Sequence, residues 1–193
     1  MAVGRTSSTG LPWLVASSDL TNGSDIIYPT SVAGSGVTLS GGEVSFSAAS
    51  ILSVNGCFNS TYDSYVIVTK LAQSGDSTIS LRMRTAGIDA SGAEYDTQLT
   101  INAATGITNA RTTSATSGYF GYASSDHFST INMHSPALAA ITYYFSNVVY
   151  GPAMNSVIVA GRHTPTTAYD GFTIIPGSGT ITGKLRIYGL RNS

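Results

Sequence analysis

Short runs in which apolar and polar residues alternate restrict the fold of this chain more than any other feature of its sequence. In residues 79–84, Ile, Leu and Met alternate with Ser, Arg and Arg, and residues 185–188 repeat the pattern with Leu and Ile opposite Arg and Tyr. A period of two places one apolar face on a core and one polar face in water, as in a half-buried β-strand. In residues 65–70, Tyr, Ile and Thr alternate with Val, Val and Lys, which is typical of a strand that is buried on both faces near its middle.

Clusters of turn-forming residues separate these runs, and short strands divided by turn signals are typical of a sandwich or barrel. They are Gly75-Asp76, Ser91-Gly92, Thr105-Gly106, Ser124-Ser125-Asp126, Gly151-Pro152 and residues 176–179. No convincing helical periodicity of about ten residues or more interrupts them. The sequence therefore predicts an all-β fold, an antiparallel β-sandwich of the jelly-roll kind, formed by residues 41–193.

Residues 1–40 differ from the rest because they are rich in Gly, Ser and Thr and poor in apolar groups. We predict that they form an extended N-terminal docking arm. Trp13, Leu14 and Tyr28 are its candidate assembly contacts, since an aromatic side chain supplies a large apolar area in an otherwise thin segment. The alternative is a small local cluster with no role in assembly.

Charge is scarce in this chain. Charged residues make up 10% and the net charge is −1, against about 25% charged residues in an average globular protein. This balance gives no electrostatic footprint for nucleic acids or anionic membranes, whose binding needs clustered Lys and Arg. No run approaches the ~20 apolar residues of a membrane span. A near-zero net charge promotes self-association. We favour a surface that is largely covered in an assembly over a protein that is merely adhesive.

Cysteine and histidine offer no evident metal chemistry. Cys57 is the only cysteine, so no intrachain disulfide can form, and we expect it to be a small buried apolar group. His127, His134 and His163 are too far apart in sequence to be ligands on one loop. We interpret them as surface histidines, with a site shared by His134 and His163 across a threefold axis as the alternative. No metal and no cofactor is predicted.

Catalytic motifs are equally hard to find. The sequence holds no Gly-x-Ser-x-Gly elbow and no P-loop or convincing dinucleotide fingerprint. Asp63 precedes a strand, where Asp commonly caps a turn, and Asp89, Glu94 and Asp96 lie in a stretch that favours a solvated hairpin loop over a calcium site. We therefore predict no catalytic residue and no enzyme. A glycan-degrading enzyme, with two facing carboxylates, is the alternative.

Tyrosine is abundant, with 11 residues. Exposed Tyr suits both subunit interfaces and sugar stacking, because its ring is apolar and its tip is polar. Tyr119, Tyr122 and Tyr144 are the candidate glycan or subunit contacts. The alternative is that such residues complete the core of the sandwich.

Two segments carry a resemblance to a known family. The first comprises residues 54–68, followed by Leu-Arg-Met-Arg at 81–84 and Ser-Gly-Ala-Glu-Tyr at 91–95. The second is residues 169–190, from Tyr-Asp-Gly-Phe to Ile-Tyr-Gly-Leu. Together they frame most of residues 50 to 190, and they resemble the β-sandwich domains of virion structural proteins of tailed bacteriophages. Tyr62, Asp63, Tyr65, Asp170 and Gly171 are shared with this pattern, and we expect them to be structural.

The resemblance implies a viral structural protein that is commonly a homotrimer and has no chemistry of its own. We expect a tail or baseplate appendage that contacts the host surface in receptor binding. A capsid decoration protein is the alternative, and a carbohydrate-binding module is an alternative of another class. The expected partners are the chain itself, other virion proteins and a host surface glycan, without nucleic acid or membrane insertion. The expected location is the phage particle, with the tail favoured over the capsid. Deleting residues 1–30 should then leave the sandwich folded but prevent its incorporation into particles.

Overall fold

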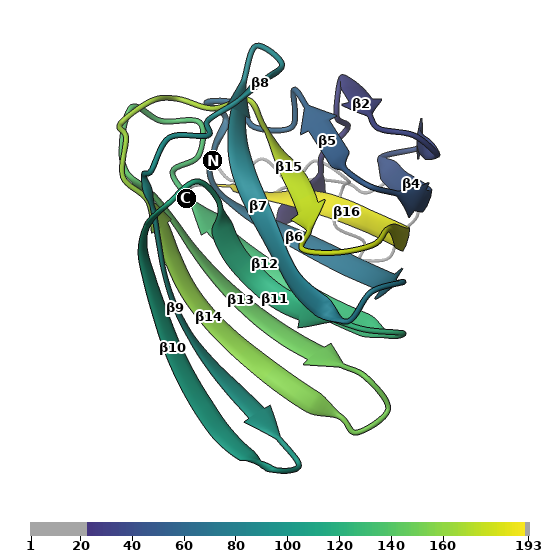
Figure 1. Cartoon of the computed structure of the whole chain (residues 1–193). Helices are drawn as coiled ribbons and strands as arrows, with labels where there is room; N and C mark the ends of the chain where they lie inside the picture. The colour runs from purple at the N-terminus through teal and green to yellow at the C-terminus, as the bar shows by residue number, and fades with distance from the viewer. Residues whose placement is uncertain (1–22, 192–193) are drawn as a thin grey trace, which may run out of the picture.

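The computed structural model describes residues 23–191, which form two antiparallel β-sheets that face each other (Figure 1). The described part of the chain contains strands, turns and bends but no helix. The prediction of an all-β antiparallel sandwich is confirmed. In Figure 1 the smaller sheet lies in front of the larger one. The β9–β10 hairpin of the larger sheet, at the lower left, extends beyond the smaller sheet.

The large sheet has ten strands, in the order β10-β9-β14-β13-β12-β6-β16-β4-β3, with β1 pairing to β16 beside β4. Its strands are β1 (Ser24–Ile26), β3 (Val37–Ser40), β4 (Glu43–Ala49), β6 (Tyr62–Gln73), β9 (Tyr95–Ala103), β10 (Gly106–Ala115), β12 (His127–His134), β13 (Thr142–Tyr150), β14 (Asn155–His163) and β16 (Ile181–Arg191). The long strand β6 lies between β12 and β16, so its pairing partners come from distant parts of the chain.

The small sheet has six strands, in the order β11-β7-β15-β5-β2, with β8 pairing to β7. Its strands are β2 (Ser31–Ala33), β5 (Leu52–Asn55), β7 (Ser77–Thr85), β8 (Ile88–Asp89), β11 (Gly118–Ala123) and β15 (Gly171–Pro176).

The core lies between the sheets and follows from the alternation. Ile79, Leu81 and Met83 of β7 are buried, as the period-two pattern predicts. They face buried side chains of the large sheet such as Tyr65 and Ile67 on β6. Each buried aliphatic side chain of this kind stabilises the fold by about 1.5–3 kcal/mol. The expectation that the other face lies in water was wrong in part, because Ser80 and Arg84 on that face are buried as well.

The boundary predicted between arm and sandwich was wrong. Strands β1, β2 and β3 lie within residues 24–40 and pair with β16, β5 and β4. Ile27 is buried, and its amide donates a hydrogen bond to the carbonyl oxygen of Ile187 at 2.9 Å. These segments are too short to show a clear periodicity, and β1 and β2 pair with strands that do not follow them directly in the chain. Trp13 and Leu14 lie outside the described residues, whereas Tyr28 is 64% exposed beside β1.

The two segments that carry the family resemblance touch each other. The carbonyl oxygen of Asp170 accepts hydrogen bonds from the amides of Cys57 at 2.8 Å and Phe58 at 3.1 Å. A Cβ atom on Gly171 would overlap the carbonyl oxygen of Val54 on the paired strand, so only glycine fits there. Cys57 is fully buried, as expected, and burial raises the pKa of its thiol.

Candidate interaction surface

The outer face of the large sheet consists of the side chains that point away from the small sheet. Along β13 buried and exposed residues alternate without a break, so one face belongs to the core and the other to this surface. Pairing registers arrange the outward residues in rows across the strands. Two of these rows are Tyr188–Val66–Asn132–Phe145–Ala160 and Lys184–Lys70–Phe128–Val149.

Four apolar residues on β13 and β14 form an exposed patch on this face, which we call the apolar strip. Tyr143, Phe145, Val149 and Ile158 are between 41% and 51% exposed. Single exposed apolar residues are ordinary, but a contiguous group marks an interaction site. One polar residue, Asn147, lies on the same face between Phe145 and Val149 and pairs with Ile158.

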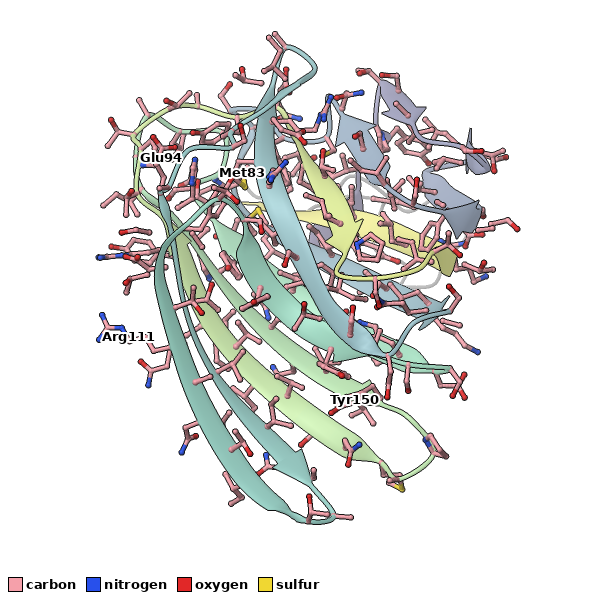
Figure 2. All side chains as sticks on the ribbon, in the orientation of Figure 1. Met83, Glu94, Arg111 and Tyr150 are labelled. Atoms are coloured by element: carbon pink, nitrogen blue, oxygen red, sulfur yellow. The ribbon has the colours of Figure 1, made fainter. Side chains whose placement is uncertain are left out.

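A first hollow of about 310 Å³ borders the strip at the ends of β9 and β14. Its polar lining comes from Asp96, Gln98, Arg111 and Arg162, with the ring of Tyr143 beside them. Arg162 Nη2 and Asp96 Oδ2 form an ion pair at 2.7 Å. The pKa of Asp96 is lowered by the hydrogen bond from the Ser114 amide and then by Arg162. In Figure 2 the side chain of Arg111 projects from β10 away from the body of the sandwich.

A second hollow of about 290 Å³ lies over β6, β12 and β16, and we call it the lysine hollow. It is lined by Lys70, Lys184 and Arg186, by Glu43, and by the apolar side chains of Val68, Phe128 and Tyr188. Glu43 Oε2 lies 3.4 Å from Lys184 Nζ and 3.1 Å from Arg186 Nη2. The hollow thus combines positive charge with apolar walls.

Two of the three histidines are buried, contrary to the prediction of surface histidines. His163 stacks on Tyr95 with ring centroids 4.2 Å apart, and its Nε2 lies 2.7 Å from the hydroxyl of Tyr169. Burial lowers the pKa of both His127 and His163 to about 4. The alternative of a threefold metal site is also wrong for His163, because its ring is enclosed in the sandwich. Only His134 is exposed, with Nδ1 2.9 Å from Ser64 Oγ.

Among the three candidate tyrosines, the prediction that Tyr144 contacts a glycan or another subunit was wrong. This residue is 3% exposed and lies between the sheets, where its hydroxyl is 3.1 Å from Thr97 Oγ1. Tyr119 and Tyr122 on β11 are half-buried, and Tyr122 packs near the ring of Tyr150. The neighbour Tyr143 is the one that reaches the outer face.

Three surface residues were not expected from the sequence: Tyr143, Phe145 and Phe128. A usable signal was present, because residues 142–150 hold large side chains at both parities of a strand. Only one parity can face the core, so the other had to be exposed. Which parity that is depends on the packing of the sheets.

The acidic residues expected in a hairpin loop turn out to serve separate structural contacts. Asp89 on β8 pairs with Arg84, Asp96 pairs with Arg162, and Glu94 Oε2 lies 3.9 Å from His163 Nε2. Within residues 23–191, no three His, Cys, Asp or Glu side chains are placed to hold a metal ion. Across the same residues there is also no helix long and apolar enough to cross a membrane.

No protein-family model and no curated protein sequence matches the chain. Solved structures overlap with it weakly. The exoplasmic/lumenal domain of VIP36, in its Ca2+/Man-bound form, has a TM-score of 0.40 and 11% identity, with 84% of each chain covered. Galectin LEC-6 of Caenorhabditis elegans has a TM-score of 0.34 and 14% identity, covering 79% of this chain and 99% of the galectin. The SPRY domain of human HERC1 has a TM-score of 0.31 and 9% identity, covering 89% of this chain and all of that domain.

Proposed function

We propose that this protein is a non-enzymatic structural component of a tailed-bacteriophage virion. In this proposal it is a homotrimeric tail or baseplate appendage that contacts the host surface. The family resemblance supports the proposal through two segments, residues 54–68 and 169–190, whose main chains meet at Asp170. A capsid decoration protein shares the same expected chemistry and differs only in its location on the particle.

The observation that carries the assembly part of the proposal is the apolar strip. Its four side chains carry no charge, and a second copy of this chain is the occupant that we assign to it. Apolar and aromatic residues are enriched at the centre of subunit interfaces, while charged residues are depleted there. The Asp96–Arg162 ion pair stands at one end of the strip, which matches the polar rim of such an interface.

Location on the particle is tested by mass spectrometry of purified virions together with immunogold electron microscopy of intact particles. We expect the protein among the virion components and the label at the tail tip or baseplate. Label spread over the head would replace the appendage by a decoration protein. A protein missing from purified virions would overturn the proposal.

A carbohydrate-binding module is the second candidate, either alone or as part of the host contact. The observation that favours it is the mixed lining of the two hollows on the outer face, where aromatic rings stand beside polar and charged groups. Binding sites for small ligands combine such apolar walls with a few placed polar groups. A glycan array probed with the purified chain tests this function, and a uniform response across glycans would contradict it.

A further inference from the structure

The chain has only two lysines, Lys70 and Lys184, and the fold makes them direct cross-strand neighbours. They are 114 residues apart in sequence, and both point to the outer face from β6 and β16. Like charges directly opposite each other in a sheet are destabilising. The protein has only nine basic residues in 193, and two of them lie directly opposite each other. Their repulsion weakens the sheet unless a negative ligand lies between them.

Neighbouring acids only partly neutralise this positive charge. Arg186 follows Lys184 on the same face of β16, and Glu43 is shared between these two cations. Lys70 forms no ion pair with any described residue. Asp126 lines an adjoining hollow together with both lysines, without coming within ion-pair distance of either. The local charge is +1 in a protein whose net charge is −1. It is the sum over three cations, Lys70, Lys184 and Arg186, and two acids, Glu43 and Asp126.

The walls of the lysine hollow add an apolar surface to the positive charge. Phe128 is the direct neighbour of Lys70 on β12 and is 52% exposed, and Val68 and Tyr188 complete the lining. The volume of about 290 Å³ lies just below the range for ligand pockets, about 300–1,000 Å³, so the hollow has room for one small unit. An exposed aromatic ring beside cations fits a ligand that has both an apolar ring face and an anionic group.

We propose that the lysine hollow binds an oxyanion-bearing sugar unit of a host-surface polysaccharide. Lys70 and Lys184 donate hydrogen bonds to the oxyanion, and the apolar face of the sugar ring packs on Phe128. Glu43 positions Lys184 and Arg186 and offers no contact to the anion itself. This inference rests on the part of the proposed function in which the protein contacts the host surface.

Two polymers with the same backbone test the requirement for charge. Polygalacturonate carries one carboxylate on each sugar, whereas its methyl ester carries none, and a polyglycerolphosphate polymer offers phosphate in place of carboxylate. Binding of the full chain to each polymer is measured by biolayer interferometry at several salt concentrations. We expect binding to polygalacturonate that weakens as salt rises, and no binding to the ester. Binding to the phosphate polymer alone would overturn the assignment to a sugar unit, because that polymer carries the anion without a sugar ring.

Variants tie the binding to this hollow. Lys70→Ala, Lys184→Ala and Phe128→Ala should each weaken binding about tenfold, the effect of losing one strong contact. Lys70→Arg should retain most of the affinity because it keeps the charge. Arg111→Ala, which removes a cation from the other hollow, is the matched control and should bind like the unmodified chain. Circular dichroism confirms that each variant is folded.

Equal binding to the polymer and to its ester, or an equal loss in Arg111→Ala, would overturn the inference. So would the absence of binding to both anionic polymers. These measurements use the purified chain alone, so they are independent of the virion experiment. A protein found in the virion that binds neither polymer would leave the proposed function intact while removing this site.

Discussion

The aromatic ring of Tyr144 lies against the backbone of Gly161, its direct partner on the neighbouring strand. A Cβ atom added to Gly161 would overlap the Cζ atom of this ring. Tyr144 cannot move aside, because it is buried and its hydroxyl also lies against Gly118 of the small sheet. Two glycines from opposite sheets therefore make the space that this one large side chain fills.

Gly161→Ala should destabilise the protein by about 2 kcal/mol or more, because the extra methyl group overpacks the core. The free energy of unfolding from urea denaturation measures this loss. Gly23→Ala is the matched control, since nothing lies within 4 Å of a Cβ atom there, and its unfolding midpoint should not change. Equal stability of the two variants would show that the ring of Tyr144 has room to shift.

Arg84→Met should destabilise the sandwich by about 3 kcal/mol, because it leaves a largely buried carboxylate without its partner. The guanidinium pairs with Asp89 and donates hydrogen bonds to Thr173 Oγ1 at 2.8 Å and Asn55 Oδ1 at 3.0 Å. Arg82→Met is the control on the same strand, since Arg82 is less buried and donates only to the carbonyl oxygen of Thr116. Thermal unfolding compares the two, and a larger loss for the control would contradict this role of Arg84.

Stability should fall as the pH is lowered from about 6.5 towards 4. His127 and His163 each have a folded pKa of about 4, because burial disfavours the charged imidazole, against 6.5 for an unperturbed histidine. In this window the unfolded chain binds protons that the folded chain does not bind. The stability that the two neutral histidines contribute is therefore fully present above pH 6.5 and is lost as the pH falls towards 4. We expect a loss of about 2 kcal/mol for each histidine by pH 5.

Urea denaturation at pH 7.5 and pH 5 measures this dependence. His163→Phe should reduce it, because the ring can still stack on Tyr95 but no longer titrates. His134→Gln should leave it unchanged, since His134 is exposed. A pH dependence that is identical in all three proteins would mean that other groups cause it.

Two truncations test which N-terminal residues belong to the sandwich. Removing residues 1–30 should lower stability by about 3 kcal/mol or more relative to removing residues 1–22. The longer deletion takes away β1 with the buried Ile27, and it also removes Asp25, which accepts a 2.7 Å hydrogen bond from the hydroxyl of Tyr62. Differential scanning calorimetry of both variants measures the difference. Equal melting temperatures would show that β1 adds nothing to stability and that the sandwich folds without residues 1–30.

Phe145→Lys should weaken self-association at least about tenfold, because it places a charge in the centre of the apolar strip. Analytical ultracentrifugation measures the oligomeric state of the variant against the unmodified chain. Ile88→Lys is the control, since Ile88 is more exposed than Phe145 but lies on the small sheet. A loss of association in the control alone would move the interface to the other sheet.

Local residue patterns were sufficient for the class of fold and for much of the core. The alternation in residues 79–84 correctly predicted Ile79, Leu81 and Met83 as core residues, because a strand must send successive side chains to opposite faces. The lone Cys57 was correctly expected to be buried. These conclusions needed only periodicity, turn residues and residue chemistry, all of which are properties of short segments.

The surface could not be derived in the same way, because it depends on pairing between distant strands. Tyr143 and Tyr144 are chemically identical neighbours, and only the packing of one sheet on the other decides that Tyr144 is buried and Tyr143 is exposed. His163 becomes buried because Tyr95 and Tyr169 close around it.

Alternation along the chain by itself determined that this protein is an antiparallel β-sandwich, since hydrophobic burial acts on each strand locally. Only the tertiary structure decided that Lys70 and Lys184 stand side by side. Their proximity arises from the register between β6 and β16, which no local pattern encodes.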